Sequence, residues 1–283
     1  MINNKVKMRK FKKRTQIIAG FLIIIMLIVI IGVVYSTTLD IDIIDDLGEG
    51  DTSIRIAHLS DIHYPNCYNL SKLFKAVNNF EPHLVFITGD IIDKATTSEE
   101  IDELLIKLRE ITDIYPSYAV IGNHELLNAN LIYFKEEIEK IGIELLENTS
   151  EAIVIEGKEL IIAGVGNLDI YNEAVLDGAG DINQGSKILL LMHQPQMWEQ
   201  VQRVNTEIMP LITFAGHAHG GQARLFGQGL VAPNQGLFPK YDSGIYYDEL
   251  HQNCMILSRG LGHSFVPIRI YDSFHLPLVT VMV

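Results

Sequence analysis

Two histidines in the stretch Gly216-His217-Ala218-His219-Gly220 are well suited to bind a metal ion. The apolar run before them, 211–215, predicts a short buried strand, and the flanking glycines allow a sharp turn at its end. Neutral imidazole is the commonest metal ligand in proteins, and in such a turn both rings can converge on one point. Taken alone, the pair is equally compatible with two surface histidines in a loop, so its meaning depends on the rest of the chain.

Four other predicted strands also end in polar residues that can bind metals. These strands are the apolar segments 54–59, 84–88, 118–121 and 188–192. In an α/β sheet, ligands bind at the carboxyl ends of the strands. The candidate ligands that follow the five strands are Asp61, His63, Asp90, Asn123, His193, His217 and His219, with His124 next to Asn123.

The number and chemistry of these side chains indicate a dinuclear metal centre. Seven ligands are too many for one tetrahedral ion. They suit two ions that lie about 3.5–4 Å apart and share a bridging carboxylate. A mixture of carboxylates and imidazoles favours zinc, iron or manganese. Each motif alone has an ordinary structural explanation, such as a turn, a helix start or a core histidine. Their conjunction, each at the end of a strand, favours the metal centre.

The elements that must position these residues form an α/β pattern. Strands alternate with three predicted helices, one at 70–79, one that begins after a cap at Ser98, and one at 131–141. This alternation indicates parallel strands with helices outside. The second half contains a predicted hairpin, and late strands follow it. We therefore expect an α/β fold, a four-layer α/β/β/α sandwich of two mixed sheets, preceded by one N-terminal transmembrane helix. The hairpin is expected at 152–155 and 160–165, and the late strands at 254–258 and 278–282.

The N-terminal region predicts a membrane anchor. Eighteen uncharged residues, Ile17 to Val34, follow seven basic ones. Such a run spans about 27 Å as a helix, close to the thickness of the hydrocarbon core. The positive-inside rule makes 1–16 a basic cytoplasmic tail and 17–35 a single-pass anchor in the cell membrane, with the catalytic domain extracytoplasmic. A cleaved signal peptide is the alternative, although its apolar region would be shorter, about 7–15 residues.

The rest of the chain is acidic. All 35 acidic residues follow the apolar run, and the net charge of the chain is −13. This composition disfavours a nucleic-acid-binding surface, but not a phosphate ester held by metal ions. Residues 36–53 end in Gly48-Glu49-Gly50-Asp51 and are predicted to be a linker, so the domain is expected at 54–283. Cys67 and Cys254 could form one disulfide outside the cytoplasm.

The order of the motifs resembles that of the calcineurin-like metallophosphoesterases, whose pattern is D-x-H, G-D-x-x-D, G-N-H-[DE], H and G-H-x-H. Every block is present, and the resemblance covers about residues 54 to 283. The tail segments 216–222, 236–241, 258–262 and 267–269 further resemble a bacterial membrane-associated branch. That branch includes phosphodiesterases and enzymes likened to UDP-diacylglucosamine hydrolases.

The resemblance also implies a role for each site residue. One metal would be held by Asp61, His63, Asp90 and His219, and the other by Asp90, Asn123, His193 and His217. Two cations lower the pKa of a shared water, so that a bridging hydroxide can attack phosphorus near neutral pH. His124 would act as general acid towards the leaving group, and Asp93, the second Asp of the family pattern, would orient it.

These observations predict a membrane-anchored phosphohydrolase with two divalent ions, which are Mn, Fe or Zn. Its substrate would be a phosphodiester or pyrophosphate, lipid-linked or part of the cell envelope. One alternative is a phosphomonoesterase acting on nucleotides or phosphoproteins. Another is a catalytically silent metal-binding ectodomain, which the complete ligand set and the retained His124 disfavour. Arg259 and Arg269 could grip a phosphate, although a structural role is the stronger reading. Substrate choice depends on loops 64–69, 166–186 and 226–252.

Overall fold

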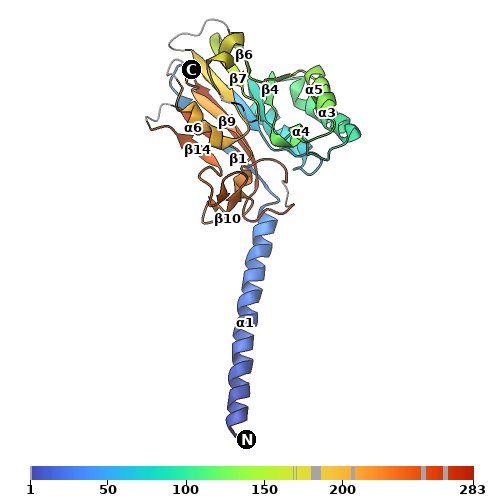
Figure 1. Cartoon of the computed structure of the whole chain (residues 1–283), viewed down its shortest axis with the longest axis vertical. Coiled ribbons are helices and arrows are strands. Elements are labelled where there is room, and N and C mark those ends of the chain that lie inside the picture. Colours follow the sequence, from blue (N-terminus) through green and yellow to red (C-terminus); the bar gives the residue numbers. More distant parts are fainter. Residues whose placement is uncertain are drawn as a thin grey trace.

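The computed structural model describes residues 2–167, 169, 171–179, 186–204, 208–249, 253–263 and 267–283. Two six-stranded sheets lie face to face at the centre of the domain, and helical segments cover their outer sides (Figure 1). A single long helix, α1 (Ile2–Tyr35), projects from one end of this domain.

The first sheet carries the helices of the first half of the chain. The strands β2 to β5 run parallel, whereas β16 is antiparallel to β2. Helices α2 (Leu70–Phe80), α3 (Ser98–Thr112) and α5 (Leu131–Lys140) pack their buried side chains in one core cluster with this sheet. The strand order is β1 (Leu39–Gly48), β16 (Phe274–Met282), β2 (Ser53–Leu59), β3 (Leu84–Thr88), β4 (Ser117–Val120) and β5 (Ile143–Leu145).

The second sheet is also mixed. Its outer face packs against a 3-10 helix at Glu173–Ala179, another at Pro195–Met197, and α6 (Trp198–Val201). Strands β7, β8, β9 and β15 run parallel, and β6 and β14 are antiparallel at the two edges. The strand order is β14 (Gly244–Tyr247), β15 (Cys254–Leu257), β9 (Ile212–Ala215), β8 (Lys187–Leu191), β7 (Lys158–Gly164) and β6 (Thr149–Ile155).

A second apolar cluster lies between the two sheets. Alternation along β2 sends Ile54 and Ile56 into this layer, together with Phe86 of β3 and Phe214 of β9. The next residues along β2, such as Leu59, pack in the cluster that includes the helices. The expected four-layer α/β/β/α sandwich of two mixed sheets is therefore confirmed.

The predicted linker at 36–53 is wrong, because most of it forms the edge strand β1. This strand pairs in parallel with β16, from Leu39 opposite Phe274 to Gly48 opposite Met282. Its many acidic residues are typical of a solvated linker. Two of them, however, pair with basic side chains from the far end of the chain. Asp40 Oδ2 lies 2.6 Å from Arg259 Nη2, and Asp42 Oδ2 lies 3.4 Å from His275 Nε2.

Smaller differences concern caps and loops. The helix expected to be capped by Ser98 is instead capped by Thr97, whose hydroxyl accepts from Glu100 N while the Glu100 carboxylate accepts from Thr97 N. The loop expected at 226–252 contains β14 and short strand pairs. Residues 168, 170, 180–185 and 250–252, which belong to the predicted loops, lie outside the described residues. The short strands are β10 (Arg224–Leu225), β11 (Gln228–Gly229), β12 (Val231–Ala232) and β13 (Gly236–Leu237).

Helix α1 is continuous through the basic residues and the apolar run. Its segment Arg14–Tyr35 is long and apolar enough to cross a membrane, judged by length and composition. Its large apolar side chains are exposed, for example Phe21 and Leu22. This exposure is what a helix surrounded by lipid would show.

Candidate metal centre

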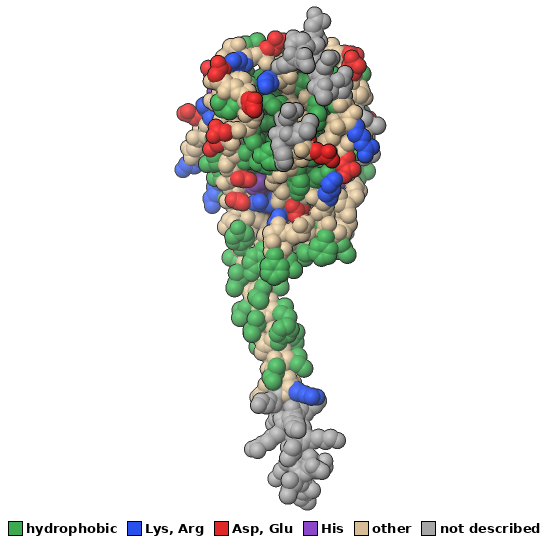
Figure 2. Space-filling model, turned by 90° about the vertical axis from the view of Figure 1, so that its left-hand side faces the viewer, with side chains coloured by type: hydrophobic (Ala, Val, Ile, Leu, Met, Phe, Trp, Pro, Cys, Tyr) green, Lys and Arg blue, Asp and Glu red, His purple; other side chains and the backbone are tan. Residues whose placement is uncertain are grey.

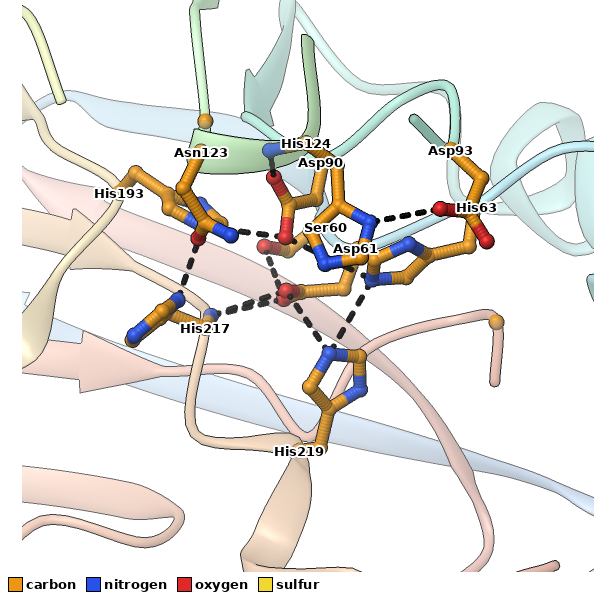
Figure 3. A network of polar contacts seen from close by, with 12 residues as sticks. Ser60, Asp61, His63, Asp90, Asp93, Asn123, His124, His193, His217 and His219 are labelled. Atoms are coloured by element: carbon orange, nitrogen blue, oxygen red, sulfur yellow. Dashed lines mark hydrogen bonds and ion pairs between the residues drawn. The ribbon is translucent and has the colours of Figure 1, made fainter. Parts of the chain in front are cut away.

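The loops that follow β2, β3, β8 and β9 bring their polar side chains together at one edge of the two sheets (Figure 3). The ligand atoms of Asp61, His63, Asp90 and His219 all lie within 4.8 Å of one another, and so do those of Asp90, His193 and His217. Asp90 is common to both groups. The arrangement therefore has two centres that share one carboxylate.

The backbone that aims these side chains is unusual. Five of the residues have positive φ angles in the left-handed region, which non-glycine residues seldom adopt. Such strain persists only where the surrounding structure enforces it, and it clusters at functional sites. The residues and their φ angles are Asp61 at 49°, His63 at 49°, Asp90 at 50°, His217 at 70° and His219 at 49°.

Two glycines allow the loops to approach each other. A Cβ atom on Gly122 would lie 2.2 Å from Asp90 Oδ1, and one on Gly216 would lie 1.8 Å from Ser60 Oγ. Both distances are far below van der Waals contact, so a side chain at either position would displace the carboxylate or its supporting hydroxyl. These glycines are part of the site because of the space they leave.

Hydrogen bonds from the protein hold both carboxylates. Asp61 accepts from Ser60 Oγ at 2.6 Å and from His217 N at 3.0 Å. Asp90 Oδ1 accepts from the backbone N–H of His124 at 2.8 Å. The remaining contacts face imidazoles, because Asp90 Oδ2 lies 3.3 Å from His193 Nε2 and Asp61 Oδ1 lies 3.4 Å from His219 Nε2.

The imidazole nitrogens also face one another in pairs. His63 Nε2 lies 3.1 Å from His219 Nε2, and His193 Nε2 lies 3.1 Å from His217 Nδ1. Asn123 Oδ1 lies 3.2 Å from His193 Nε2. Buried nitrogen lone pairs that point at each other beside carboxylates repel unless a cation or a proton lies between them. The donor set therefore fits borderline divalent metals, which accept imidazole and carboxylate together.

The pKa values of two of these imidazoles also suit metal binding. Burial lowers the pKa of His63 to about 4 and that of His217 to about 3, so both rings are neutral at pH 7. Burial opposes protonation of His193, but the Asp90 carboxylate outweighs it and raises the pKa of His193 to about 10. Burial also opposes ionisation of Asp90, yet His193 holds the pKa of Asp90 below its ordinary value. Without metal, His193 and Asp90 thus form a buried ion pair.

His124 and Asp93 lie together at the rim of this cluster. His124 Nδ1 is 2.8 Å from Asp93 Oδ1, and the side chains are 15% and 23% exposed. The His124 ring contacts the edge of His63, with ring centroids 4.5 Å apart. Asp93 is itself fixed, because its backbone N–H donates to Thr96 Oγ1 at 2.8 Å. His124 is therefore oriented next to the cluster while it still reaches solvent.

Sequence reasoning gave no role to Glu125, which ties two strand-end loops together. Its buried carboxylate accepts from the backbone N–H groups of Asp90, Ile92 and Gly122 at 2.9–3.0 Å. The only available signal was its place directly after His124 in the motif. Asn234 is a further such residue, since its Nδ2 lies 3.2 Å from His217 Nε2, and no pattern in the sequence points to it.

The two arginines of the tail have structural roles. Arg269 is 1% exposed, pairs with Asp272 at 3.0 Å, and donates from Nη2 to the carbonyl oxygens of Arg259 and Gly262. The same nitrogen lies 3.2 Å from His219 Nδ1. Arg259 pairs with Asp40 of β1. These pairings leave neither arginine free to grip a phosphate.

The two cysteines of the chain are both unpaired. Burial raises the pKa of the Cys67 thiol to about 11 and that of Cys254 to about 12. Both therefore stay protonated at neutral pH, and neither contributes a thiolate ligand. The possible disulfide between them is absent from the structure.

Sequence comparison connects this geometry to known proteins. The chain is 24% identical over 226 residues to a Bacillus subtilis metallophosphoesterase, YkuE, covering 78% of the chain and 76% of that protein. It is 27% identical over 241 residues to F40B5.2 of Caenorhabditis elegans, whose name calls it a metallophosphoesterase. That match covers 81% of the chain and 48% of the worm protein. It is 26% identical over 248 residues to a Danio rerio transmembrane protein with a metallophosphoesterase domain. That match covers 82% of the chain and 54% of the fish protein. The chain thus spans about half the length of the worm and fish proteins.

The family comparison covers the part of the chain that builds the cluster. Residues 54–233, more than half of the chain, match the calcineurin-like phosphoesterase family. This range includes the six side chains of the two groups, together with Asn123 and both rim residues. The chain therefore belongs to the calcineurin-like phosphoesterases and is a metal-dependent phosphoesterase with a dimetal-binding cluster.

Proposed function

We propose that this protein is a membrane-anchored phosphodiesterase or pyrophosphatase that acts on a lipid-linked or envelope phosphate. The observation that carries the proposal is the position of Asp90, which belongs to both groups of ligand atoms. A shared carboxylate is the arrangement that two-metal hydrolases use. The apolar run of α1 supports anchoring. The name of the fish relative, which describes a transmembrane protein, supports it too.

We assign the site residues by their position in the cluster. The ligands of one ion would be Asp61, His63, Asp90 and His219, and those of the other Asp90, Asn123, His193 and His217. When bound, the two ions supply a nucleophilic water of lowered pKa and neutralise charge on the phosphoryl oxygens. Manganese, iron and zinc all suit this donor set.

The protein contributes orientation and proton transfer. The carboxylate of Asp93 accepts from the Nδ1–H of His124, which leaves Nε2 free to hold the proton that is transferred. His124 then donates a proton from Nε2 to the leaving oxygen of the substrate. Its partial exposure fits this role, because the leaving group must depart towards solvent.

The test uses the full chain in detergent, loaded with manganese. Hydrolysis of bis(p-nitrophenyl) phosphate is compared with that of p-nitrophenyl phosphate, and His217→Ala serves as the inactive control. We expect the diester to be preferred and the variant to be inactive. Preference for the monoester would replace the proposal with a phosphomonoesterase. Two bound ions without turnover of either probe or of lipid diesters would favour the silent metal-binding domain.

A further inference from the structure

The end of α1 is seated on the loop that precedes β16. Tyr271 N donates to Gly32 O at 3.1 Å, and Tyr271 Oη donates to Ile28 O at 3.0 Å. Asp272 N donates to Ser36 Oγ at 2.9 Å. A Cβ atom on Gly32 would lie 2.7 Å from the Tyr271 ring, so this close contact requires glycine. The domain is therefore held against the helix rather than suspended from a linker.

This contact sets the height of the domain relative to the apolar run of α1. Ile28 lies six residues before Val34, the end of that run, which corresponds to about 9 Å along the helix axis. The hydroxyl of Tyr271 reaches Ile28 from outside the helix. Once α1 crosses a bilayer, the loop around Tyr271 must lie at the depth of the membrane interface rather than above it.

The neighbouring end of the domain is apolar. We call it the tip surface, defined by six exposed side chains around strands β10 to β13 and the loop before β16. Figure 1 places β10 at the end of the domain beside α1, and Figure 2 shows hydrophobic side chains at this end, next to those of the helix. The six residues are Leu225, Phe226, Val231, Leu237, Phe238 and Ile268.

Two phenylalanines of the tip surface are held in strained conformations. Phe226 has φ 53° and Phe238 has φ 51°, although bulky residues rarely adopt positive φ. Phe226 is 99% exposed at the turn between β10 and β11, where asparagine or glycine is the ordinary choice. Neither the turn nor the core gains from this side chain, so its presence indicates contact with something outside the domain.

A cavity of about 630 Å³ opens beside the tip surface. Val231 and Ile268 belong to both, and His219 of the candidate metal centre is part of the cavity wall. Most of the other lining residues are apolar, including Leu230, Pro233 and Ile270. A hydrocarbon chain in this cavity would therefore extend from the tip surface to the side of the metal centre.

We propose that the tip surface inserts into the interface of the same bilayer that α1 crosses, so that the cavity opens to lipid. The inference rests on the proposed anchoring by α1. Aromatic and aliphatic side chains at the interface gain free energy from burial in the acyl boundary. The partner is the bilayer rather than a second copy of the chain, because Tyr271 fixes this face at the depth of the interface. A membrane-resident substrate could then reach the metal centre without leaving the bilayer.

Tryptophan quenching by lipid tests this placement. The full chain is reconstituted into phosphatidylcholine vesicles with brominated acyl chains, and Phe226→Trp is compared with Val154→Trp. Val154 is a matched control, since it is 71% exposed on β6, at the far end of the domain from α1 (Figure 1). The native Trp198 is buried and provides a constant background. Phe21→Trp, within the apolar run, reports insertion of α1 itself.

We expect strong quenching of Phe21→Trp and Phe226→Trp, and none of Val154→Trp. Quenching at Phe21 without quenching at Phe226 would overturn the docking while leaving the anchor intact. Absence of quenching at Phe21 would overturn both. A second copy of the chain could instead cover the tip surface. In that case brominated lipid would not quench the tryptophan of Phe226→Trp, whereas dilution of the protein in the membrane would expose that tryptophan to aqueous iodide. This result would overturn the proposal.

A kinetic test separates docking from catalysis. The double variant Phe226→Ser/Phe238→Ser is assayed on dioleoyl phosphatidyl-p-nitrophenol in vesicles and on soluble bis(p-nitrophenyl) phosphate. We expect kcat/KM to fall about tenfold or more on the lipid probe only, whereas Val154→Ser changes neither rate. Equal loss on both probes, or no loss on either, would contradict the proposal. Inactivity of the unmodified chain on both probes would instead contradict the proposed function.

Discussion

His124 Nδ1 lies 2.8 Å from Asp93 Oδ1, although the two residues are 31 positions apart and follow different strands. The contact orients an imidazole that has access both to the buried cluster and to solvent. Because a carboxylate accepts at Nδ1, the proton that can be transferred is the one on Nε2. The pair therefore has the geometry of a general acid and the residue that positions it.

Replacement of His124 should affect poor leaving groups most. We expect His124→Gln to lower kcat by about 10²–10⁴-fold on alkyl phosphodiesters, since general acid catalysis contributes about this much. On p-nitrophenyl diesters, whose leaving group needs little protonation, the loss should be much smaller. Steady-state rates on both substrates measure this, and metal content should be unchanged. An equal loss on both substrates would contradict the general-acid role.

Asp93→Asn should have a weaker effect than His124→Gln. The amide can no longer hold the imidazole by a charge-assisted bond, so we expect kcat to fall about tenfold. Asp93 is proposed to act only through His124. The double variant should therefore be no slower than His124→Gln alone, and a further loss in the double variant would show that Asp93 has an independent role.

Metal content should distinguish the shared ligand from the others. We expect about two ions per chain in the unmodified protein, fewer than one in Asp90→Ala, and about one in His217→Ala, because only Asp90 belongs to both groups. Elemental analysis after dialysis measures this. His83→Ala, which alters a residue outside the groups that could hold a metal, is the control and should retain both ions. Equal metal content in all variants would rule out the assignment.

Glu125→Gln should destabilise the site without removing a proposed ligand. The carboxylate accepts from three backbone N–H groups, whereas an amide offers one oxygen and presents an N–H to the remaining donors. A buried donor left unpaired costs about 1–3 kcal/mol, so the free energy of unfolding should fall by this amount. Urea denaturation of the full chain in detergent measures it, with the exposed Glu110→Gln as control. Equal stability of both variants would mean that Glu125 does not hold the two strand-end loops together.

His58 should make stability depend on pH. Burial lowers its pKa to about 3, from 6.5 in the unfolded chain, and its ring contacts Thr88 Oγ1 in the core at 2.8 Å. The stabilisation is fully present above pH 6.5 and is lost as pH falls towards 3, because the unfolded chain then binds a proton that the folded chain does not. The slope is about 1.4 kcal/mol per pH unit.

The matching variant is His58→Gln, which retains a donor towards Thr88 but does not titrate. Between pH 6.5 and 5, the unmodified chain should lose about 2 kcal/mol more stability than the variant, by the same slope. Other histidines contribute equally to both proteins and cancel in the comparison. Parallel stability curves for the two proteins would refute the assignment to His58.

Much of the site could be predicted from the sequence because its information is local. Asp61, His63, Asp90, His193, His217 and His219 each follow a short apolar run, and parallel strands place their carboxyl ends at one edge. The periodicity of the apolar residues likewise identified the main helices and most strands. Chain order and spacing were therefore enough to predict that these side chains converge.

What the sequence could not determine are contacts between distant segments. Residues 36–53 read as an acidic linker because the partners of Asp40 and Asp42 lie more than 200 positions later, at Arg259 and His275. Likewise, the clamp made by Glu125 depends on where three backbone N–H groups meet. Such contacts arise when the sheets pack, and no local pattern records them.

The relation between the anchor and the domain has the same origin. The sequence alone determined that α1 is long, apolar and preceded by basic residues. Only the tertiary structure decided that Tyr271 packs on Gly32, that Phe226 and Phe238 have strained backbones, and that β10 lies at the end of the domain beside the helix. Helix formation depends on neighbours three and four residues apart, whereas docking depends on shape complementarity between surfaces that folding brings together.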